Sequence, residues 1–195
     1  MRCGRRVGPN LVAMAAQSTM LALGTPAPAF ALPEPATGAV VRSTELTGPA
    51  LVVTFLCNHC PYVQHVAAGL ADLGRDLAAK GVPMVGISSN DVVAYPQDGP
   101  EAMAAEAARH GWTFPYLYDQ TQDVARAYSA ACTPDTFVFD PARRLVYRGR
   151  LDGSRPGSGV PVTCADVRAA VEAVLAGRPV EQDQQPSIGC GIKWR

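Results

Sequence analysis

The sequence predicts an α/β fold in which helices cover both faces of a central mixed β-sheet. Short apolar segments alternate with amphipathic segments as far as about residue 130, as expected for strands joined by helices. An alternating hairpin and a last helix follow, and a hairpin adds antiparallel strands to such a sheet. With 195 residues, 48% of them hydrophobic, the chain suffices for one sizeable core, so we predict one domain.

The first long apolar run, Leu51 to Val63, predicts a buried strand that gives way to a helix. The run reads L-V-V-T-F-L-C-N-H-C-P-Y-V, and we expect the helix to begin near Cys60. Pro61 supports this start, because proline fits the first turn of a helix, where its missing N–H loses nothing. Apolar residues then recur at steps of three and four, as in a helix packed on a sheet: Val63, Val66, Ala67, Leu70, Leu73 and Leu77.

The remaining elements are predicted from short apolar runs and helix boundary signals. In chain order they are a buried strand at 84–88, a helix at 101–109, a short strand within 112–119, a helix at 121–129, an alternating hairpin within 135–148 and a final helix at 163–176. Thr163 and Asp166 have the spacing of a capping box, with aspartate in place of the usual glutamate, and this spacing predicts the start of the final helix.

The N-terminus resembles a signal peptide only in part. Arginines precede the apolar run 11–16 and an A-x-A sequence follows at 27–29, but polar residues 17–19 interrupt the run. We predict a disordered extension over 1–19, a folded domain over 20–180 and a C-terminal tail over 181–195 that packs on the domain. The expected location is the cytoplasm, with export as the alternative if the N-terminus is a signal peptide.

Charge and hydropathy exclude several classes of partner. Seventeen basic and seventeen acidic side chains cancel, and no basic stripe is interleaved with aromatic residues. This composition argues against nucleic acid or an anionic membrane surface as the main partner. No apolar run approaches the ~20 residues that a membrane-spanning helix requires. We therefore expect a protein thiol or a small molecule as substrate.

The Cys-x-x-Cys sequence at the predicted strand-to-helix junction indicates thiol chemistry. Unpaired N–H groups in the first turn of a helix stabilise a thiolate, so Cys57 is the expected nucleophile and should be solvent-reachable. Cys60 would lie one turn further, more shielded, and would resolve a mixed disulfide formed on Cys57. His59 would add a positive charge or a hydrogen-bond donor near the Cys57 thiolate.

Other cysteines leave alternatives open. A zinc site made of Cys57, His59, Cys60 and Cys132 is less favoured, because the adjacent His59 and Cys60 point in different directions. Cys132 is either a third thiol near the pair or a residue that fills space. Cys190, in a glycine-rich tail, is either an additional resolving thiol or buried filler, and we favour the latter. We expect no metal and no organic cofactor.

Several stretches together resemble one known group of proteins: 24–33, 57–63, 114–119, 132–135, 147–152 and 187–194. They are similar to the peroxiredoxin-like proteins of the thioredoxin fold, grouped with the alkyl hydroperoxide reductase and thiol-specific antioxidant superfamily. This resemblance implies a thioredoxin-like fold. It also implies that Pro134 is cis and faces the cysteine pair, and that the backbone of Thr133 pairs with an extended substrate segment.

The expected function is thiol–disulfide exchange through the pair Cys57 and Cys60, reset by an external dithiol or disulfide. Reduction of hydroperoxides is the alternative, since Thr54 matches the Thr/Ser-x-x-Cys step of peroxiredoxins, although Ala50 occupies the proline position. Arg148 or Arg150 would then assist. A zinc-binding or scaffold protein is a further alternative. The strand at 50–56 carries no acid, so proton transfer is left open among His59, Asp135 and water.

Overall fold

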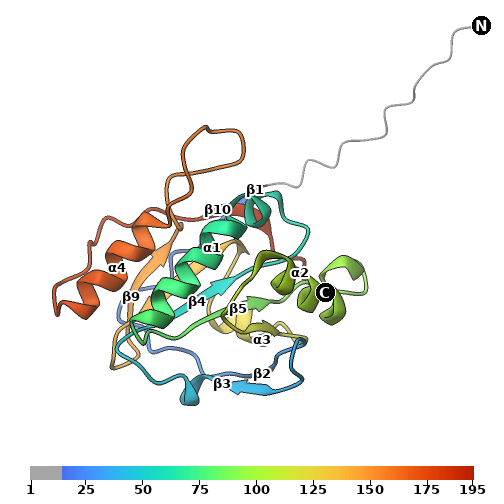
Figure 1. The fold of residues 1–195 in the computed structure, drawn as a ribbon, viewed down its shortest axis with the longest axis horizontal. Helices are drawn as coiled ribbons and strands as arrows, with labels where there is room; N and C mark the ends of the chain where they lie inside the picture. The colour runs from blue at the N-terminus through green and yellow to red at the C-terminus, as the bar shows by residue number, and fades with distance from the viewer. Residues whose placement is uncertain (1–14) are drawn as a thin grey trace, which may run out of the picture.

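The computed structural model describes residues 15–195 and contains a five-stranded central sheet (Figure 1). Its strands are β4 (Leu51–Phe55), β5 (Met84–Ser88), β6 (Tyr116–Tyr118), β8 (Asp135–Phe139) and β9 (Leu145–Gly149). They lie in the order β6-β5-β4-β8-β9. The pairs β4–β5 and β5–β6 are parallel, whereas β8 is antiparallel to both β4 and β9. The predicted mixed sheet is confirmed.

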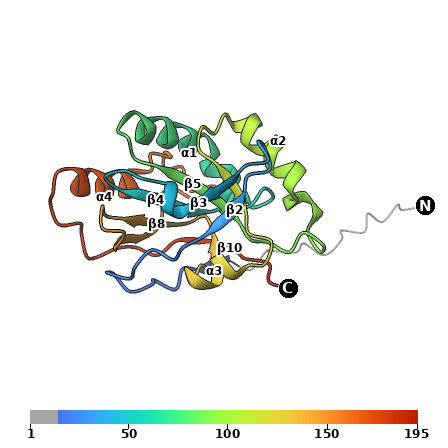
Figure 2. The ribbon, with the colours of Figure 1, turned by 90° about the horizontal axis from the view of Figure 1, so that it is seen from below.

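Helices cover both faces of this sheet. They are α1 (Pro61–Ala79), α2 (Pro100–His110), α3 (Asp123–Ala127) and α4 (Ala165–Leu175). Because side chains alternate along a strand, Val52 of β4 packs with Leu70 of α1 and Val171 of α4, while Phe55 packs with Val124 of α3. Figure 2 shows α1, α2 and α4 on one side and α3 on the other. The predicted arrangement of layers is therefore confirmed.

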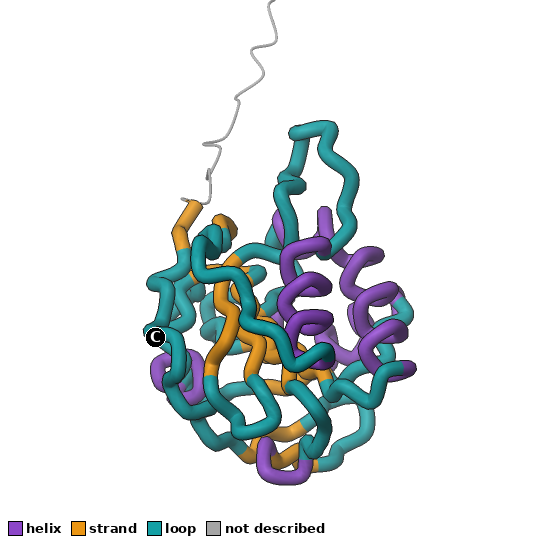
Figure 3. Tube along the Cα trace, turned by 90° about the vertical axis from the view of Figure 1, so that its left-hand side faces the viewer, coloured by secondary structure: helices purple, strands orange, loops and turns teal. Residues whose placement is uncertain are grey.

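The predicted capping box at the start of the last helix is wrong. The residue that precedes α4 is Cys164, and no side chain caps the helix directly. Instead, the N–H groups of Thr163 and Cys164 donate to Oδ2 of Asp152, at 2.7 and 2.6 Å. Asp152 belongs to the loop between β9 and α4, which projects from the body of the molecule in Figure 3. A carboxylate that is distant in sequence thus replaces the local capping interaction.

A second sheet joins the two ends of the described chain. It consists of β1 (Ala15–Gln17), β10 (Ile188–Gly191) and β7 (Cys132–Thr133), in the order β1-β10-β7 and antiparallel throughout. The predicted disordered extension over 1–19 is therefore wrong for 15–17, because β10 supplies a strand edge that orders them. Residues 1–14 of that extension lie outside the described residues, as does the cluster of N-terminal arginines.

Gly189 allows β10 to lie close to β7. A Cβ atom at position 189 would lie 2.0 Å from the carbonyl oxygen of Thr133, which is far inside the contact distance of two heavy atoms. Only glycine permits this approach, and the C-terminal tail is consequently held against the segment that precedes Pro134.

Two smaller features complete the fold. A separate hairpin pairs β2 (Ala31–Pro33) with β3 (Val40–Arg42), and 3₁₀ turns lie at Ser43–Glu45 and Pro96–Asp98. Among the described residues, no helix has the combined length and apolar character needed to cross a membrane.

Candidate active site

The junction between β4 and α1 carries both cysteines of the Cys-x-x-Cys sequence. Cys60 is the residue that caps α1, which begins at Pro61 as predicted, whereas Cys57 lies in the connecting loop three residues before the cap. Both side chains are sealed from solvent, with relative exposures of 1% for Cys57 and 0% for Cys60. The expectation that Cys57 is solvent-reachable is therefore wrong for this structure, because the sulfur of Cys57 lies against Thr133 of β7.

Thr133 lies against both sulfur atoms. Its hydroxyl oxygen is 3.2 Å from Cys57 Sγ, and its carbonyl oxygen accepts a hydrogen bond from the Cys60 thiol at 3.1 Å. The Thr133–Pro134 peptide bond is cis, which confirms that prediction. However, Thr133 is opposite Cys190 in the β7–β10 ladder. The tail of the chain itself thus occupies the edge where an extended substrate was expected to pair.

The pKa values of the two thiols shift in opposite directions. The pKa of the Cys57 thiol is raised well above its usual value by the neighbouring Cys60 side chain, by burial and by the nearby Asp98 charge. The pKa of Cys60 is lowered by the neighbouring Cys190 and Cys57 side chains, and the N–H of Val63 at the helix start acts in the same direction. The expectation that its surroundings make Cys57 acidic is therefore wrong.

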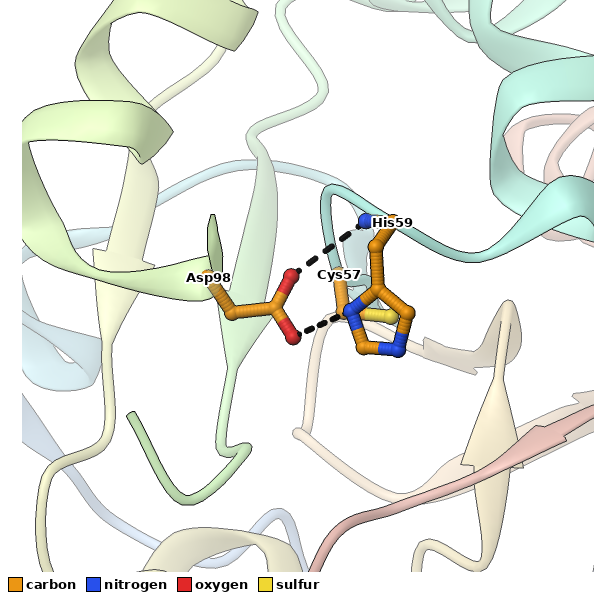
Figure 4. A group of neighbouring side chains, drawn as sticks. All are labelled: Cys57, His59 and Asp98. Carbon is orange, nitrogen blue, oxygen red and sulfur yellow. Dashed lines mark hydrogen bonds and ion pairs between the residues drawn. The ribbon is translucent and has the colours of Figure 1, made fainter. Parts of the chain in front are cut away.

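Asp98 is a buried carboxylate beside the pair, and Figure 4 shows it facing His59. Its Oδ2 is 2.6 Å from Nδ1 of His59, and Asn90 donates to the same oxygen at 2.8 Å. Its Oδ1 accepts the N–H groups of Asn58, at 2.8 Å, and of His59, at 3.3 Å. Burial opposes the ionised form, but these hydrogen bonds outweigh it and lower the pKa of Asp98. Asp98 therefore fixes the loop that carries Cys57.

The position of His59 is set from two sides. Its ring stacks on Tyr95, with ring centres 5.4 Å apart and planes within 6°. The opposite constraint is the ion pair with Asp98. His59 consequently lies close to Cys57, as the sequence predicts, with its orientation fixed by residues outside the Cys-x-x-Cys segment.

The other two candidate cysteines have different surroundings. The Cys132 thiol is fully buried and lies 3.8 Å from the carbonyl oxygen of Pro134, and burial raises its pKa well above the usual range. Cys190 is 3% exposed and is paired with Thr133, whose carbonyl oxygen accepts the Cys60 thiol. Cys190 is thus buried, as favoured from the sequence, but it is paired with a residue that contacts the cysteine pair.

Metal-ligand atoms also converge here. Within the described part of the chain, one group of at least three such side chains has its ligand atoms within 4.8 Å of one another, and it consists of Cys57, His59 and Asp98. This set differs from the four-residue zinc alternative, since Asp98 takes the place of Cys60 and Cys132. A metal bound through Nδ1 of His59 would have to displace the 2.6 Å ion pair with Asp98.

A model of the AhpC/TSA family matches residues 23–148, which include the cysteine pair, Asp98 and the cis-proline loop. The chain belongs to the AhpC/TSA family. The predicted resemblance is thereby confirmed, and family membership supports a thiol redox function. No functionally curated protein matches this member of the AhpC/TSA family.

Solved structures agree with this assignment. An uncharacterized conserved protein from Geobacillus kaustophilus is 52% identical, with a TM-score of 0.91 over 93% of this chain and 96% of that one. A hypothetical protein from Sinorhizobium meliloti 1021 is 49% identical, with a TM-score of 0.90 over 92% and 98%. A thiol:disulfide interchange protein of the thioredoxin family from Chlorobium tepidum TLS is 21% identical, with a TM-score of 0.61 over 79% and 98%, and shows the shared fold.

The residues expected to assist peroxide reduction in this AhpC/TSA protein are engaged elsewhere. The Thr54 hydroxyl lies 3.2 Å from the Thr136 hydroxyl, across the β4–β8 pair. Arg148 donates to the carbonyl oxygen of Leu21, and Arg150 forms an ion pair with Asp166 at 2.6 Å. The structure therefore does not bring Thr54, Arg148 and Arg150 together around Cys57.

Sequence reasoning missed Asp98, because about forty residues separate it from Cys57 and it lies just before the predicted helix at 101–109. One signal was available. The polar cluster at 88–91 follows a buried parallel strand, and ligands and polar sites gather at the carboxyl ends of such strands. Asn90 of this cluster is the residue that bonds Asp98.

The buried carboxyl group of Asp135, one of the proton-transfer candidates, should make the stability of the folded protein depend on pH. Burial raises the pKa of its carboxyl group to about 8. The folded protein therefore keeps this proton over a pH range in which the unfolded chain, with a pKa near ~3.9, releases it. The associated stability is fully present below about pH 4 and is lost as the pH rises toward about 8.

Relative to Asp135→Asn, the wild-type free energy of unfolding should fall by about 2–3 kcal/mol between pH 5 and pH 7, since each unit of pH contributes up to ~1.4 kcal/mol. Urea unfolding of both proteins at pH 5, 6 and 7 measures this difference. Parallel pH profiles for the two proteins would show that the Asp135 carboxyl is ionised in the fold.

Proposed function

We propose that this AhpC/TSA protein is a thiol–disulfide oxidoreductase that cycles Cys57 and Cys60 between a dithiol and a disulfide. The observation that carries the proposal is that both sulfur atoms lie against Thr133, Cys57 Sγ 3.2 Å from its hydroxyl oxygen and Cys60 Sγ 3.1 Å from its carbonyl oxygen. A disulfide requires the two sulfurs to approach to about 2 Å, and two cysteines that are three residues apart and contact the same residue are placed for it. Neither a metal nor an organic cofactor is needed for this exchange.

The nucleophile is the thiolate of Cys57. Both members of the resting pair are thiols, since the Cys60 thiol donates to the carbonyl oxygen of Thr133. Cys57 loses its proton to water before it attacks. His59, held by Asp98 next to Cys57, is placed to stabilise the thiolate charge if it is protonated.

The exchange then proceeds in two balanced steps. The Cys57 thiolate attacks one sulfur of a substrate disulfide, a mixed disulfide forms, and the other substrate sulfur leaves as a thiolate. Cys60, after losing its proton to that leaving thiolate, attacks Cys57 Sγ, and the second substrate thiolate leaves. The substrate disulfide is reduced and the pair is oxidised. An external dithiol restores the pair by the reverse reaction.

Substrate size follows from the burial of the pair. Both sulfurs are closed to solvent, and β10 occupies the edge of β7 beside them. An extended polypeptide therefore cannot pair with Thr133 in this arrangement. Small disulfides, or a flexible segment that enters after local opening, fit the site better.

The same burial favours small hydroperoxides as a second candidate substrate, because hydrogen peroxide is smaller than any disulfide. Attack of the Cys57 thiolate on the peroxide would give a sulfenic acid and an alcohol or water, and condensation with Cys60 would release water. The engagement of Thr54, Arg148 and Arg150 elsewhere makes this the less favoured reaction.

The test starts from fully reduced protein treated with glutathione disulfide, followed by blocking of free thiols and mass mapping. We expect two glutathione thiols to be released per chain and an intramolecular disulfide that includes Cys60. Glutathione retained on Cys57, or no release, would contradict the proposal. Consumption of hydrogen peroxide much faster than by free cysteine would instead select the peroxidase reaction. Copurified zinc with no activity toward insulin disulfides would indicate a metal-binding protein.

A further inference from the structure

We propose that Cys190 is a third redox thiol, which exchanges with the oxidised pair to form a Cys60–Cys190 disulfide and to release Cys57. This inference rests on the proposed function, because it begins from a Cys57–Cys60 disulfide. It assigns a chemical role to the C-terminal strand β10, which the exchange reaction of the pair does not use.

The first observation is the register of β10. Cys190 is paired with Thr133, and the carbonyl oxygen of Thr133 is the atom that accepts the Cys60 thiol at 3.1 Å. Cys60 and Cys190 therefore meet at one residue from two different elements. Cys60 and Cys190 belong to the same buried core cluster, and Cys190 is almost fully buried.

The second observation is that β10 is held in this place from several directions. Its outer edge pairs with β1, where Ala15 is opposite Cys190. Gly189 lets the strand approach the Thr133 carbonyl more closely than any other residue would allow. Beyond the strand, Ile192 donates its N–H to the carbonyl oxygen of Ala131 at 3.1 Å. The Cys190 sulfur is thus a fixed neighbour of Cys60.

The residues that follow β10 also contact the groups that hold Asp98 and His59 in place. The N–H of Lys193 donates to Oδ1 of Asn90 at 2.8 Å, and the Asn90 amide donates to Asp98. The Lys193 ammonium group also lies over the ring of Tyr95, 5.6 Å from its centre, and Tyr95 stacks on His59. The tail therefore contacts the supports of both cysteines, which places Cys190 within the redox site.

The remaining buried cysteines differ from Cys190. Cys132 directs its thiol to the Pro134 carbonyl oxygen, and Cys164 lies at the start of α4. Of the three, Cys190 is the one paired with Thr133, whose backbone carbonyl oxygen accepts the Cys60 thiol. Cys57 instead lies against the Thr133 hydroxyl, so attack by Cys190 on the oxidised pair is directed to the Cys60 sulfur.

The exchange is balanced without any co-reactant. The Cys190 thiol loses its proton and attacks Cys60 Sγ, so that the Cys60–Cys190 bond forms while the Cys57–Cys60 bond breaks. Cys57 leaves as a thiolate and takes up the proton that Cys190 released. The chain still contains one disulfide after the exchange. Cys57, the nucleophile, is now a free thiol.

The experiment traps this disulfide in a protein that cannot form the first one. Reduced Cys57→Ser protein is treated with one equivalent of diamide, blocked with N-ethylmaleimide and digested with trypsin. The digest separates the candidate partners, because an arginine or lysine cleavage site lies between each two of Cys60, Cys132, Cys164 and Cys190. The expected product is a cross-link between the Cys60 and Cys190 peptides.

Matched variants establish the assignment. Adding Cys190→Ser to Cys57→Ser should abolish the cross-link, whereas adding Cys164→Ser should leave its yield unchanged. In wild-type protein oxidised in the same way, N-ethylmaleimide should label Cys57 in the fraction that carries the Cys60–Cys190 cross-link.

Two results would overturn the inference: recovery of Cys60 as the blocked thiol in Cys57→Ser, or a Cys60–Cys132 cross-link as the main product. If either occurs while wild-type protein still forms Cys57–Cys60 and releases glutathione, only the role of Cys190 fails. If wild-type protein forms no intramolecular disulfide at Cys60, the proposed function fails as well.

Discussion

Replacing Cys57 with serine should lower the rate of disulfide exchange on the order of a thousandfold or more, because a serine hydroxyl does not ionise near neutral pH and cannot replace a thiolate. The rate is measured as glutathione thiol released from glutathione disulfide by the reduced protein. Serine is nearly the size of cysteine, so the buried junction should stay folded, which a thermal unfolding curve checks.

The comparison with Cys60→Ser separates the two roles. That variant should still attack glutathione disulfide, but the mixed disulfide on Cys57 should persist, since the resolving thiol is absent. Cys164→Ser, at the start of α4, is the matched buried control and should exchange at the wild-type rate. A trapped adduct on Cys60 in Cys57→Ser, with undiminished turnover, would assign the nucleophile to Cys60 instead.

Replacing Asp98 with alanine should lower the free energy of unfolding by about 3–5 kcal/mol, because removal of one partner of a buried ion pair leaves the other groups unsatisfied. Asp98 is fully buried and accepts two backbone N–H groups, the Asn90 amide and the His59 ring nitrogen. Urea unfolding at pH 7 measures the loss. Exchange activity should fall in the same variant, since the loop that carries Cys57 loses its anchor.

Two control variants test this interpretation. The first, Asp76→Ala, removes an ion pair with Arg168 at the surface. Because Asp76 is 53% exposed, the free energy of unfolding should change by less than ~1 kcal/mol. Asp98→Asn tests the charge. Because hydrogen bonds lower the pKa of Asp98, its contribution is present above about pH 4 and is lost as the pH falls through the lowered pKa. Equal stability of wild type and Asp98→Ala at pH 7 would contradict the role of Asp98.

The fold could be predicted from the sequence because the patterns that indicate its strands and helices lie within short segments. The run at Leu51–Phe55 is apolar except for Thr54, as expected for a strand buried on both faces, and Pro61 marks the start of α1. The final helix was also located correctly. Its cap was not, because Asp152 competes for the same N–H groups from a loop more than ten residues away.

The candidate site could be predicted from the sequence only in part. The cysteine pair followed from a short motif, and the cis bond before Pro134 from the resemblance to a known family. The burial and the raised pKa of Cys57 did not, because they depend on Thr133 and on the charge of Asp98, which come from other parts of the chain. The ordering of residues 15–17 likewise depends on β10, at the far end of the chain.

The sequence by itself determined the layered α/β architecture, the adjacent pair Cys57 and Cys60, and the expectation of thiol redox chemistry. Only the tertiary structure decided that the pair is buried, which carboxylate supports the site and that Cys190 is paired with the residue that accepts the Cys60 thiol. The physical reason is that strand and helix propensities act between near neighbours in the chain, whereas burial, pKa and thiol contacts depend on groups brought together through the folded core.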